Sequence, residues 1–343
     1  MLQAIELRHF RCYTEKTFWV GGQNSAWIGP NASGKTSVLE AIQKVAILRG
    51  FGKEEELLQW GASAYRLRAH LADGIVEVLY EKGKGTRVLW EGVPIEPLHH
   101  WIGRLPVVSL KPSDISWIES GAAERRRWAD RLLSQSSPLY MEALSRYQRA
   151  LSQRNALLAL TETTPSQIEA WNHVLEQEGI QIQLFRYRLV EHLYPLLQEF
   201  YSGFGPEKVA LTYRYSVEPA LEDWRKAWQR VYAEERRRGY TLIGPHLEDF
   251  LLLLDGRPAR GYASEGQKKS LLIALKWAEV AHLQRYGSPP LLLLDDIGEK
   301  LDEHRLQAVG RLSQLASQTF ITDTDENRVR RAFPEIEILS TFP

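Results

Sequence analysis

The feature that most constrains this chain is a run that matches the phosphate-loop pattern G-x-x-x-x-G-K-[ST] at every fixed position. The segment 25–28, apolar after its serine, predicts a short buried strand before it, and apolar positions three and four apart over 36–48 predict a helix after it. A strand, a glycine-rich turn and a helix in this order favour a phosphate site over an ordinary turn. The run and the residue after it are Gly29, Pro30, Asn31, Ala32, Ser33, Gly34, Lys35, Thr36 and Ser37.

The chemistry of such a loop predicts its ligands. Glycines let successive backbone N–H groups face a phosphate chain, and the N-terminus of the following helix adds its positive end. Lys35 is then expected to reach the β- and γ-phosphates of ATP, and the Thr36 hydroxyl to bind Mg²⁺. We therefore predict ATP and Mg²⁺ as cofactors, residues 29–37 as binding residues, and Lys35 as a catalytic residue.

Composition limits the classes of protein that the chain can belong to. Its 343 residues suffice for two domains, or for one domain with a large insertion. Lys and Arg number 43, as do Asp and Glu, so any surface that attracts nucleic acid must be local. The lone Cys12 excludes an intramolecular disulfide and favours a reducing cytoplasm. We see neither a signal peptide nor a membrane-length apolar run, and predict no membrane partner.

Periodicity divides the chain into two parts. Residues 1–28 are predicted to form strands, and residues 64–90 alternate like the hairpins of an antiparallel N-terminal sheet. Residues 113–240 instead have the spacing of amphipathic helices around one short strand at 209–215. After residue 240 an α/β pattern returns, with strands predicted at 250–254, 291–295, 319–322 and 336–338. We predict an α/β nucleotide-binding lobe, formed by 1–112 and 241–343, that is split by a mainly helical insertion at 113–240.

Two carboxylates end the apolar strand at 291–294. Asp295 is expected to hold Mg²⁺ opposite Thr36, and Asp296 to orient or deprotonate the water that attacks the phosphate. An acid after a short apolar strand is a weak pattern alone, but an upstream phosphate loop makes it a strong one.

A second loop, Ser264-Glu265-Gly266-Gln267, precedes a predicted helix and resembles the signature loop of ABC-type ATPases. A serine hydroxyl and backbone amides at a helix N-terminus form an anion site. The resemblance implies an ABC-type P-loop ATPase fold for the split lobe. It also implies that Ser264, Gly266 and Gln267 cap the ATP of a second subunit, so that ATP makes a homodimer. The alternative is an ordinary serine N-cap.

Two further segments match this class only in part. Leu301-Asp302 fits its D-loop, whereas Glu299 and Lys300 replace the usual residues of the segment 298–302. After the next strand the class normally carries a histidine that faces the γ-phosphate. Thr322-Asp323-Thr324 stands there instead, which leaves Thr322 as a candidate phosphate sensor.

Three stretches resemble the RecF family of SMC-like DNA replication and repair ATPases, and the likeness covers essentially the whole chain. They are Leu7-x-x-Phe10-Arg11-x-Tyr13, the segment 111–130, and the segment 242–249 with its Gly244-Pro245-His246. The chain departs from the family pattern at Ser113, at Ala122-Ala123 and at Leu247. Its spacing from Thr36 to Ser264 is too long for a transporter ATPase and too short for an SMC coiled-coil arm.

The resemblance implies a function and an additional nucleotide contact. It implies that Arg11 approaches the nucleotide, and that an ATP-dependent dimer holds single- and double-stranded DNA at gap junctions. It also implies that the protein acts with RecO and RecR to load RecA recombinase, in recombination and the SOS response. ATP hydrolysis is expected to be weak and to be coupled to DNA binding and dimer dissociation.

An arginine-rich stretch from Glu124 to Arg154 is the candidate DNA surface. We predict DNA contacts at Arg125, Arg126, Arg146 and Arg149, with Arg154 a further candidate. The alternative is a solvated charged face, with Arg125 and Arg126 bracing the two lobes. Two other functions remain open at this point: a P-loop kinase with a helical lid, and a binding module in which ATP is structural.

Overall fold

The structure is a computed structural model that describes residues 1–20, 22, 24–48, 53–160, 162, 164–296 and 301–339. These residues divide into two compact units: the split unit, Met1–Ile115 with Lys269–Pro343, and the inserted unit, Ser116–Lys268. The sequence placed the second boundary near residue 240. It falls at 268 because the strand at Asp249–Leu254 pairs with Val209–Arg214, which belongs to the insertion.

An antiparallel sheet forms the N-terminal part of the split unit, as predicted. Within the described residues it has six strands in the order β2-β1-β4-β5-β6-β7. Alternate side chains of β4, among them Tyr65, Leu67 and Ala69, are buried, which is the period of a sheet with one covered face. The strands are β1 (Leu2–Phe10), β2 (Tyr13–Trp19), β4 (Ala64–Leu71), β5 (Gly74–Glu81), β6 (Gly85–Trp90) and β7 (Val93–Pro94).

A parallel sheet carries the phosphate loop. Among the described residues its strand order is β14-β3-β13-β12-β8, and all neighbours are parallel. Every residue of β12 is buried, in keeping with an apolar strand covered on both faces. The strands are β3 (Asn24–Ile28), β8 (Val107–Leu110), β12 (Leu291–Asp295), β13 (Gln318–Asp323) and β14 (Glu337–Leu339), which lies at the predicted edge.

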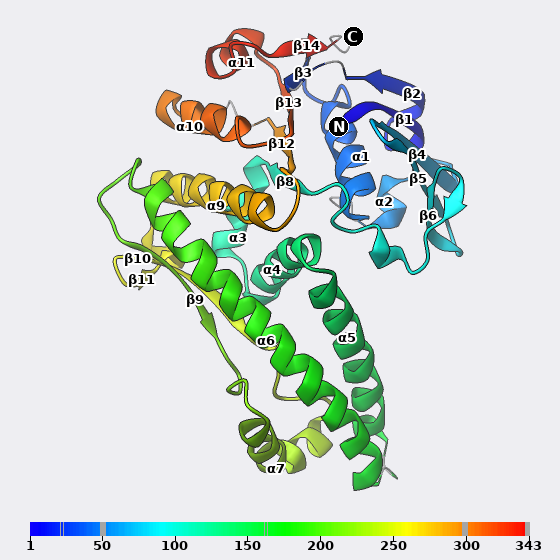
Figure 1. Ribbon diagram of the computed structural model, residues 1–343, viewed down its shortest axis with the longest axis vertical. Coiled ribbons are helices and arrows are strands. Elements are labelled where there is room, and N and C mark those ends of the chain that lie inside the picture. The colour runs from blue at the N-terminus through cyan, green and yellow to red at the C-terminus, as the bar shows by residue number, and fades with distance from the viewer. Residues whose placement is uncertain are drawn as a thin grey trace. The chain divides into compact units, whose positions relative to one another are not determined.

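Helix α1 (Lys35–Ile47) joins the two sheets into one core. It contacts β1, β4 and β5 of the antiparallel sheet and β8, β12 and β13 of the parallel one, as Figure 1 shows. Val38, Ile42 and Val45 are buried on it at helical spacing. The other helical segments of the unit are α2 (Glu54–Leu57), η1 (Leu98–His100), η2 (Pro112–Ile115), most of α9 (Glu265–Tyr286), α10 (Glu303–Ser313) and α11 (Glu326–Ala332).

The inserted unit is mainly helical, as expected. Helices α5 (Pro138–Ala159) and α6 (Pro165–Tyr201) run side by side in Figure 1, and the buried Tyr140, Tyr147 and Leu189 lie on their apolar stripes. In the described part of this unit, β9 (Val209–Arg214), β10 (Asp249–Leu254) and β11 (Arg257–Pro258) form a small antiparallel sheet. The remaining helices are α3 (Ser116–Glu119), α4 (Ala122–Ser136), α7 (Leu221–Arg238) and α8 (Ala259–Tyr262).

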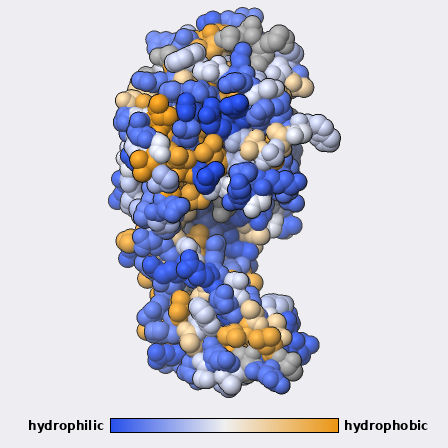
Figure 2. All heavy atoms as spheres, turned by 90° about the vertical axis from the view of Figure 1, so that its right-hand side faces the viewer, coloured by the Kyte–Doolittle hydropathy of each residue, from blue (hydrophilic) through white to orange (hydrophobic). Residues whose placement is uncertain are grey.

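On the face shown in Figure 2, hydrophilic side chains surround separate apolar patches. Within the described residues, no helix combines the length and the apolarity that crossing a bilayer requires.

Candidate nucleotide-binding site

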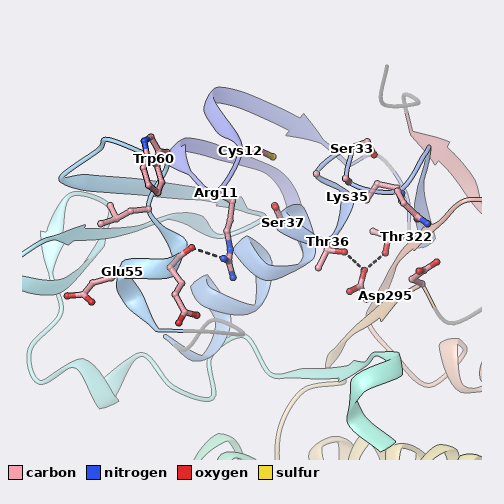
Figure 3. Close-up of a pocket in the computed structure, with 16 residues that line it drawn as sticks. Arg11, Cys12, Ser33, Lys35, Thr36, Ser37, Glu55, Trp60, Asp295 and Thr322 are labelled. Carbon is pink, nitrogen blue, oxygen red and sulfur yellow. Dashed lines mark hydrogen bonds between the residues drawn. The ribbon is translucent and has the colours of Figure 1, made fainter. Parts of the chain in front are cut away.

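A cavity of about 610 Å³ lies at the carboxyl ends of the parallel strands in the split unit. Its walls come from the loop before α1, the first turn of α1, the ends of β12 and β13, the β1–β2 turn, and α2 with the residues after it (Figure 3). In open α/β sheets this edge is where ligands bind. The lining residues are Arg11, Cys12, Asn31, Ala32, Ser33, Gly34, Lys35, Thr36, Ser37, Glu55, Glu56, Leu58, Trp60, Asp295, Asp296 and Thr322.

The phosphate loop has the backbone that its glycines predict. Gly34 has a φ of 97°, and a Cβ there would lie 2.8 Å from Cys12 Sγ and would also collide with the Tyr13 ring. Only glycine fits this position. Gly34 is also the N-cap of α1, and no side chain caps the helix there. The first backbone N–H groups of α1 are thus placed to bind an anion.

Lys35 is buried against its own loop. Its Nζ donates to the carbonyl oxygens of Gly29, at 2.8 Å, and Pro30, at 2.6 Å. An ammonium group has three N–H donors, so these two bonds leave one for a phosphate oxygen. The structure therefore holds the positive charge in the cavity wall where the sequence predicts it, and the catalytic role of Lys35 remains a prediction.

Thr36, Asp295 and Thr322 converge on one oxygen atom. Thr36 Oγ1 donates to Asp295 Oδ1 at 2.8 Å, and Thr322 Oγ1 donates to the same oxygen at 2.6 Å. A carboxylate and a hydroxyl are the hard oxygen ligands that Mg²⁺ prefers. Among the described residues no group of three or more His, Cys, Asp and Glu could hold a metal alone. The donor set thus fits Mg²⁺ that takes its remaining ligands from phosphate and water.

Asp296 stands at the end of β12, where the chain turns sharply. Its φ of 48° is in the left-handed region, and its N–H donates to the Thr322 carbonyl at 2.9 Å. Positive φ is uncommon for a residue with a side chain, and such positions often occur at functional sites. The turn puts Asp296 in the cavity wall beside Asp295.

Arg11 reaches the cavity, but its guanidinium group has a partner that the sequence analysis missed. Its Nε and Nη2 donate to the two oxygens of Glu40, at 2.6 and 2.8 Å, and its Nη1 donates to the Glu56 carbonyl at 2.6 Å. The hydrogen bonds that Arg11 donates to Glu40 raise the pKa of Arg11. Glu40 lies one helical turn after Thr36, so the sequence already places it on the same face of the helix as a predicted site residue. Nucleotide contact by Arg11 remains a prediction.

The loop at Ser264 forms a reciprocal cap at the start of α9. The Ser264 N–H donates to Gln267 Oε1 at 2.8 Å, and the Gln267 N–H donates to Ser264 Oγ at 3.2 Å. Ser264 is exposed, and its hydroxyl accepts in this cap, so the cap does not use the O–H hydrogen. Gln267 Nε2 also donates to Glu207 at 2.6 Å, so Gln267 shapes the turn that carries Ser264 and Gly266.

The D-loop segment is only partly described. Gly298, Glu299 and Lys300 lie outside the described residues. Asp302 caps α10, since its Oδ1 accepts the Arg305 N–H at 3.0 Å and its carboxylate pairs with the Arg305 side chain. This is a structural role within the split unit.

The predicted DNA-binding arginines have different surroundings. Arg125 is 7% exposed and donates to both oxygens of Asp249, at 2.8 and 2.9 Å, so it braces α4 to β10 within the inserted unit. This geometry does not support the predicted DNA contact of Arg125, because its charge is buried and paired. Arg126 is half-buried and donates to the Glu248 carbonyl at 2.6 Å. On α5, Arg146 pairs with Glu178 at 2.6 Å, and Arg149 is exposed.

Arg154 also departs from the expected phosphate track. Its side chain is 1% exposed, donates to Glu235 at 2.6 Å and lies over the Trp228 ring, 4.1 Å from its centre. It further donates to Asn172 and Thr241. Arg154 is therefore a buried link between α5, α6 and α7.

The segment 242–249 is a structural loop in the inserted unit. A Cβ on Gly244, whose φ is 121°, would collide with Tyr147 Oη. His246 Nε2 lies 3.2 Å from the Thr241 carbonyl oxygen, which can only accept, so Nε2 carries the proton and Nδ1 accepts the Tyr147 hydroxyl at 2.7 Å. Leu247, the residue that departs from the family pattern, is exposed.

Comparison with known proteins identifies the family. No family model matches the sequence. The curated relative from Heliobacterium modesticaldum, "DNA replication and repair protein RecF", is 37% identical over 94% of this chain and 92% of its own length. The protein of the same name from Chlamydia muridarum is 32% identical, also over 94% of this chain and 92% of its own length.

Solved structures give the same result. A structure of the recombination mediator protein RecF-ATP in the RecFOR pathway has a TM-score of 0.88 and 28% identity, and covers 95% of this chain and 92% of that chain. A corresponding RecF-ATPrS structure has a TM-score of 0.87 and 26% identity, over 100% of this chain and 98% of that chain. An Smc head bound to a domain of ScpA, at 14% identity and a TM-score of 0.52, shares the fold, covering 96% of this chain and 91% of its own. The chain therefore belongs to the RecF family of DNA replication and repair proteins.

Proposed function

We propose that this chain is an ATP-dependent DNA-binding repair ATPase that is a homodimer in its ATP state. The observation that carries the proposal is the cavity in which Lys35, the uncapped start of α1 and the Thr36–Asp295 pair meet. Each of these groups has a partner on a nucleoside triphosphate. The likeness to a RecF-ATP structure at 28% identity supports ATP as the ligand.

Each residue then has a role in ATP hydrolysis. Lys35 and the backbone N–H groups of the loop hold the phosphate oxygens and stabilise the charge that develops on them. Thr36 and Asp295 hold Mg²⁺, which neutralises phosphate charge when it is bound. Thr322 fixes the orientation of the Asp295 carboxylate, and Asp296 orients or deprotonates the attacking water.

The exposed turn at Ser264 supplies the dimer contact. Its hydroxyl hydrogen and the N-terminus of α9 form a donor surface for the γ-phosphate held by a second copy. ATP then links two copies, and hydrolysis removes the phosphate that links them, so that nucleotide acts as a switch. ATP hydrolysis in such a switch is slow, and it is coupled to DNA binding and to dissociation of the dimer.

Membership of the RecF family supports a proposal for the DNA and protein partners. We propose that the dimer binds single- and double-stranded DNA at gap junctions and acts there with RecO and RecR to load RecA. The name of the RecF-ATP structure, which places that protein in the RecFOR pathway, supports this role. Arg126, Arg146 and Arg149 remain the proposed DNA contacts. The single Cys12 suits a reducing cytoplasm.

Sedimentation of the protein with ATP, with ADP and without nucleotide tests the dimer. We expect the protein to be a dimer with ATP, and a monomer with ADP or without nucleotide. Ser264→Arg should bind ATP normally but stay monomeric, because a bulky cation blocks the turn. Ser145→Arg, at an exposed position of α5, is the matched control and should dimerise. An ATP-dependent dimer of Ser264→Arg would refute this interface, and failure of the wild type to bind ATP would refute the function.

A further inference from the structure

One end of the cavity lies away from the phosphate loop. The loop, Lys35 and Asp295 lie at one end, and Trp60 and Glu55 lie at the other, with Arg11 and Ser37 between them (Figure 3). A triphosphate held by the loop and the cation occupies only the first end. The nucleoside attached to its α-phosphate must lie elsewhere, and the second end of the same cavity is available for it.

The side chain at that second end is unusual. Trp60 is 100% exposed, the highest value among the large apolar side chains of the described residues. A scattered exposed apolar residue is ordinary on a protein surface, but this one lines the cavity that carries the phosphate loop. Its indole ring therefore has a free face beside a proposed ligand site.

The backbone that carries Trp60 is fixed although the ring is not packed. The Arg11 N–H donates to the Leu57 carbonyl at 2.8 Å, and the Gln59 N–H donates to the His9 carbonyl at 2.9 Å. These bonds attach the segment before Trp60 to the end of β1 and the β1–β2 turn. The Ala62 N–H donates to the Gln59 carbonyl at 2.9 Å and closes a turn around Trp60.

Side chains hold the same turn without help from the indole. Gln59 Nε2 donates to Thr14 Oγ1 at 2.7 Å, and Gln59 Oε1 lies 2.9 Å from His9 Nδ1. Gly61 has a φ of 82°, which the third residue of such a turn requires. Replacing the Trp60 side chain should thus leave the turn intact.

We propose that Trp60 is the stacking platform for the base of the bound nucleotide, an inference that rests on the proposed ATP site. Bases stack on aromatic side chains with a gain of about 1–3 kcal/mol each, whichever base is present. A platform on a fixed turn gains this energy without a loop having to become ordered. The structure therefore assigns Trp60 to affinity for the nucleoside, while Lys35, Thr36 and Asp295 determine affinity for the phosphates.

Calorimetric titration with two ligands, MgATP and magnesium tripolyphosphate, separates these roles. Trp60→Ala should bind MgATP about 5- to 150-fold more weakly than the wild type and bind tripolyphosphate equally well. Trp60→Phe, which keeps an aromatic face, should recover most of the loss. Trp19→Ala is the matched control, since Trp19 is also exposed, at 71%, but does not line the cavity.

The outcomes distinguish this proposal from the one on which it rests. Unchanged MgATP affinity in Trp60→Ala would overturn the platform while leaving the ATP site in place. Equal losses for MgATP and tripolyphosphate would also overturn it, because they would mean a disturbed phosphate loop. Failure of the wild type to bind either ligand would overturn the ATP site itself and the platform with it.

Discussion

Thr322 Oγ1 donates a hydrogen bond to Asp295 Oδ1 over 2.6 Å, from the neighbouring strand of the parallel sheet. Both side chains are buried, Thr322 at 1% and Asp295 at 9% exposure. The sequence offered Thr322 as a phosphate sensor, in the place where ABC-type ATPases carry a histidine. The phosphate-sensor role stays a prediction, and the hydrogen bond adds a second one, which is that Thr322 orients a carboxylate expected to bind Mg²⁺.

Thr322→Val removes that hydrogen bond with little change in shape. We expect the Mg²⁺ concentration for half-maximal ATP hydrolysis to rise about tenfold or more, as for other residues that orient metal ligands. The measurement is turnover against Mg²⁺ concentration at saturating ATP. Thr212→Val, on β9 of the inserted unit, is the control. An unaltered Mg²⁺ requirement in Thr322→Val would exclude the orienting role.

Lys35→Ala should reduce ATP affinity about 10- to 100-fold, the effect of losing charged hydrogen bonds of about 1.5–3 kcal/mol. Cys12 gives a direct measurement, because it is the only cysteine of the chain and lines the cavity. ATP should slow its reaction with a thiol reagent in the wild type and in Lys226→Ala, a control on α7. Equal protection by ATP in Lys35→Ala would contradict the role of the lysine.

Asp296→Asn should bind ATP like the wild type but hydrolyse it about 10²–10⁴-fold more slowly, the usual loss when a general base is removed. Since hydrolysis is proposed to separate the two copies, the variant should accumulate as an ATP dimer. Single-turnover hydrolysis and sedimentation measure the two effects. Normal turnover would remove Asp296 from the reaction.

Glu235 and Arg154 form a buried ion pair, with side chains 0% and 1% exposed. Glu235→Gln leaves the arginine charge without its buried partner, so the free energy of unfolding should fall by about 3–5 kcal/mol. Glu222→Gln breaks the exposed pair with Lys226 and should cost at most about 1 kcal/mol. Urea unfolding measures both, and similar losses in the two variants would show that burial does not strengthen the pair.

His246 makes stability depend on pH. Burial lowers its pKa to about 4. Nearby arginines also lower the pKa, whereas the hydrogen bond to the Thr241 carbonyl raises it. The unfolded chain therefore binds more protons than the folded one between about pH 6.5 and 4, and stability falls as the pH falls through this range. From pH 7 to pH 5 the contribution of this residue to the free energy of unfolding should drop by about 2 kcal/mol. His246→Gln should lose less stability than the wild type over the same range, and parallel pH profiles would contradict the assignment.

Short-range patterns made the fold largely predictable. The predicted strands at 25–28 and 291–295 and the helix at 36–48 agree with β3, β12 and α1, because glycine turns and apolar periods are local signals. The boundary at 268 was not accessible in this way. It depends on the pairing of β9 with β10, a contact between distant segments that leaves no periodic trace.

The same distinction applies to the site. The loop and the two aspartates were predictable because each follows from a motif. The partners of Arg11 and Arg125 were not, since Glu40 and Asp249 are ordinary acids until the chain folds. Trp60 was missed although Gln59-Trp60-Gly61 reads as a turn, because no sequence rule places that turn beside the phosphate loop.

The amide of Gln267 has a further consequence for assembly. Its oxygen accepts the Ser264 N–H and its nitrogen donates to Glu207, so two hydrogen bonds hold the turn within the chain itself. A second copy would therefore meet a preorganised contact and lose little configurational entropy on docking. The affinity between the two copies would then depend on whether the bound nucleotide carries a γ-phosphate. No separate ordering of the turn would reduce that affinity.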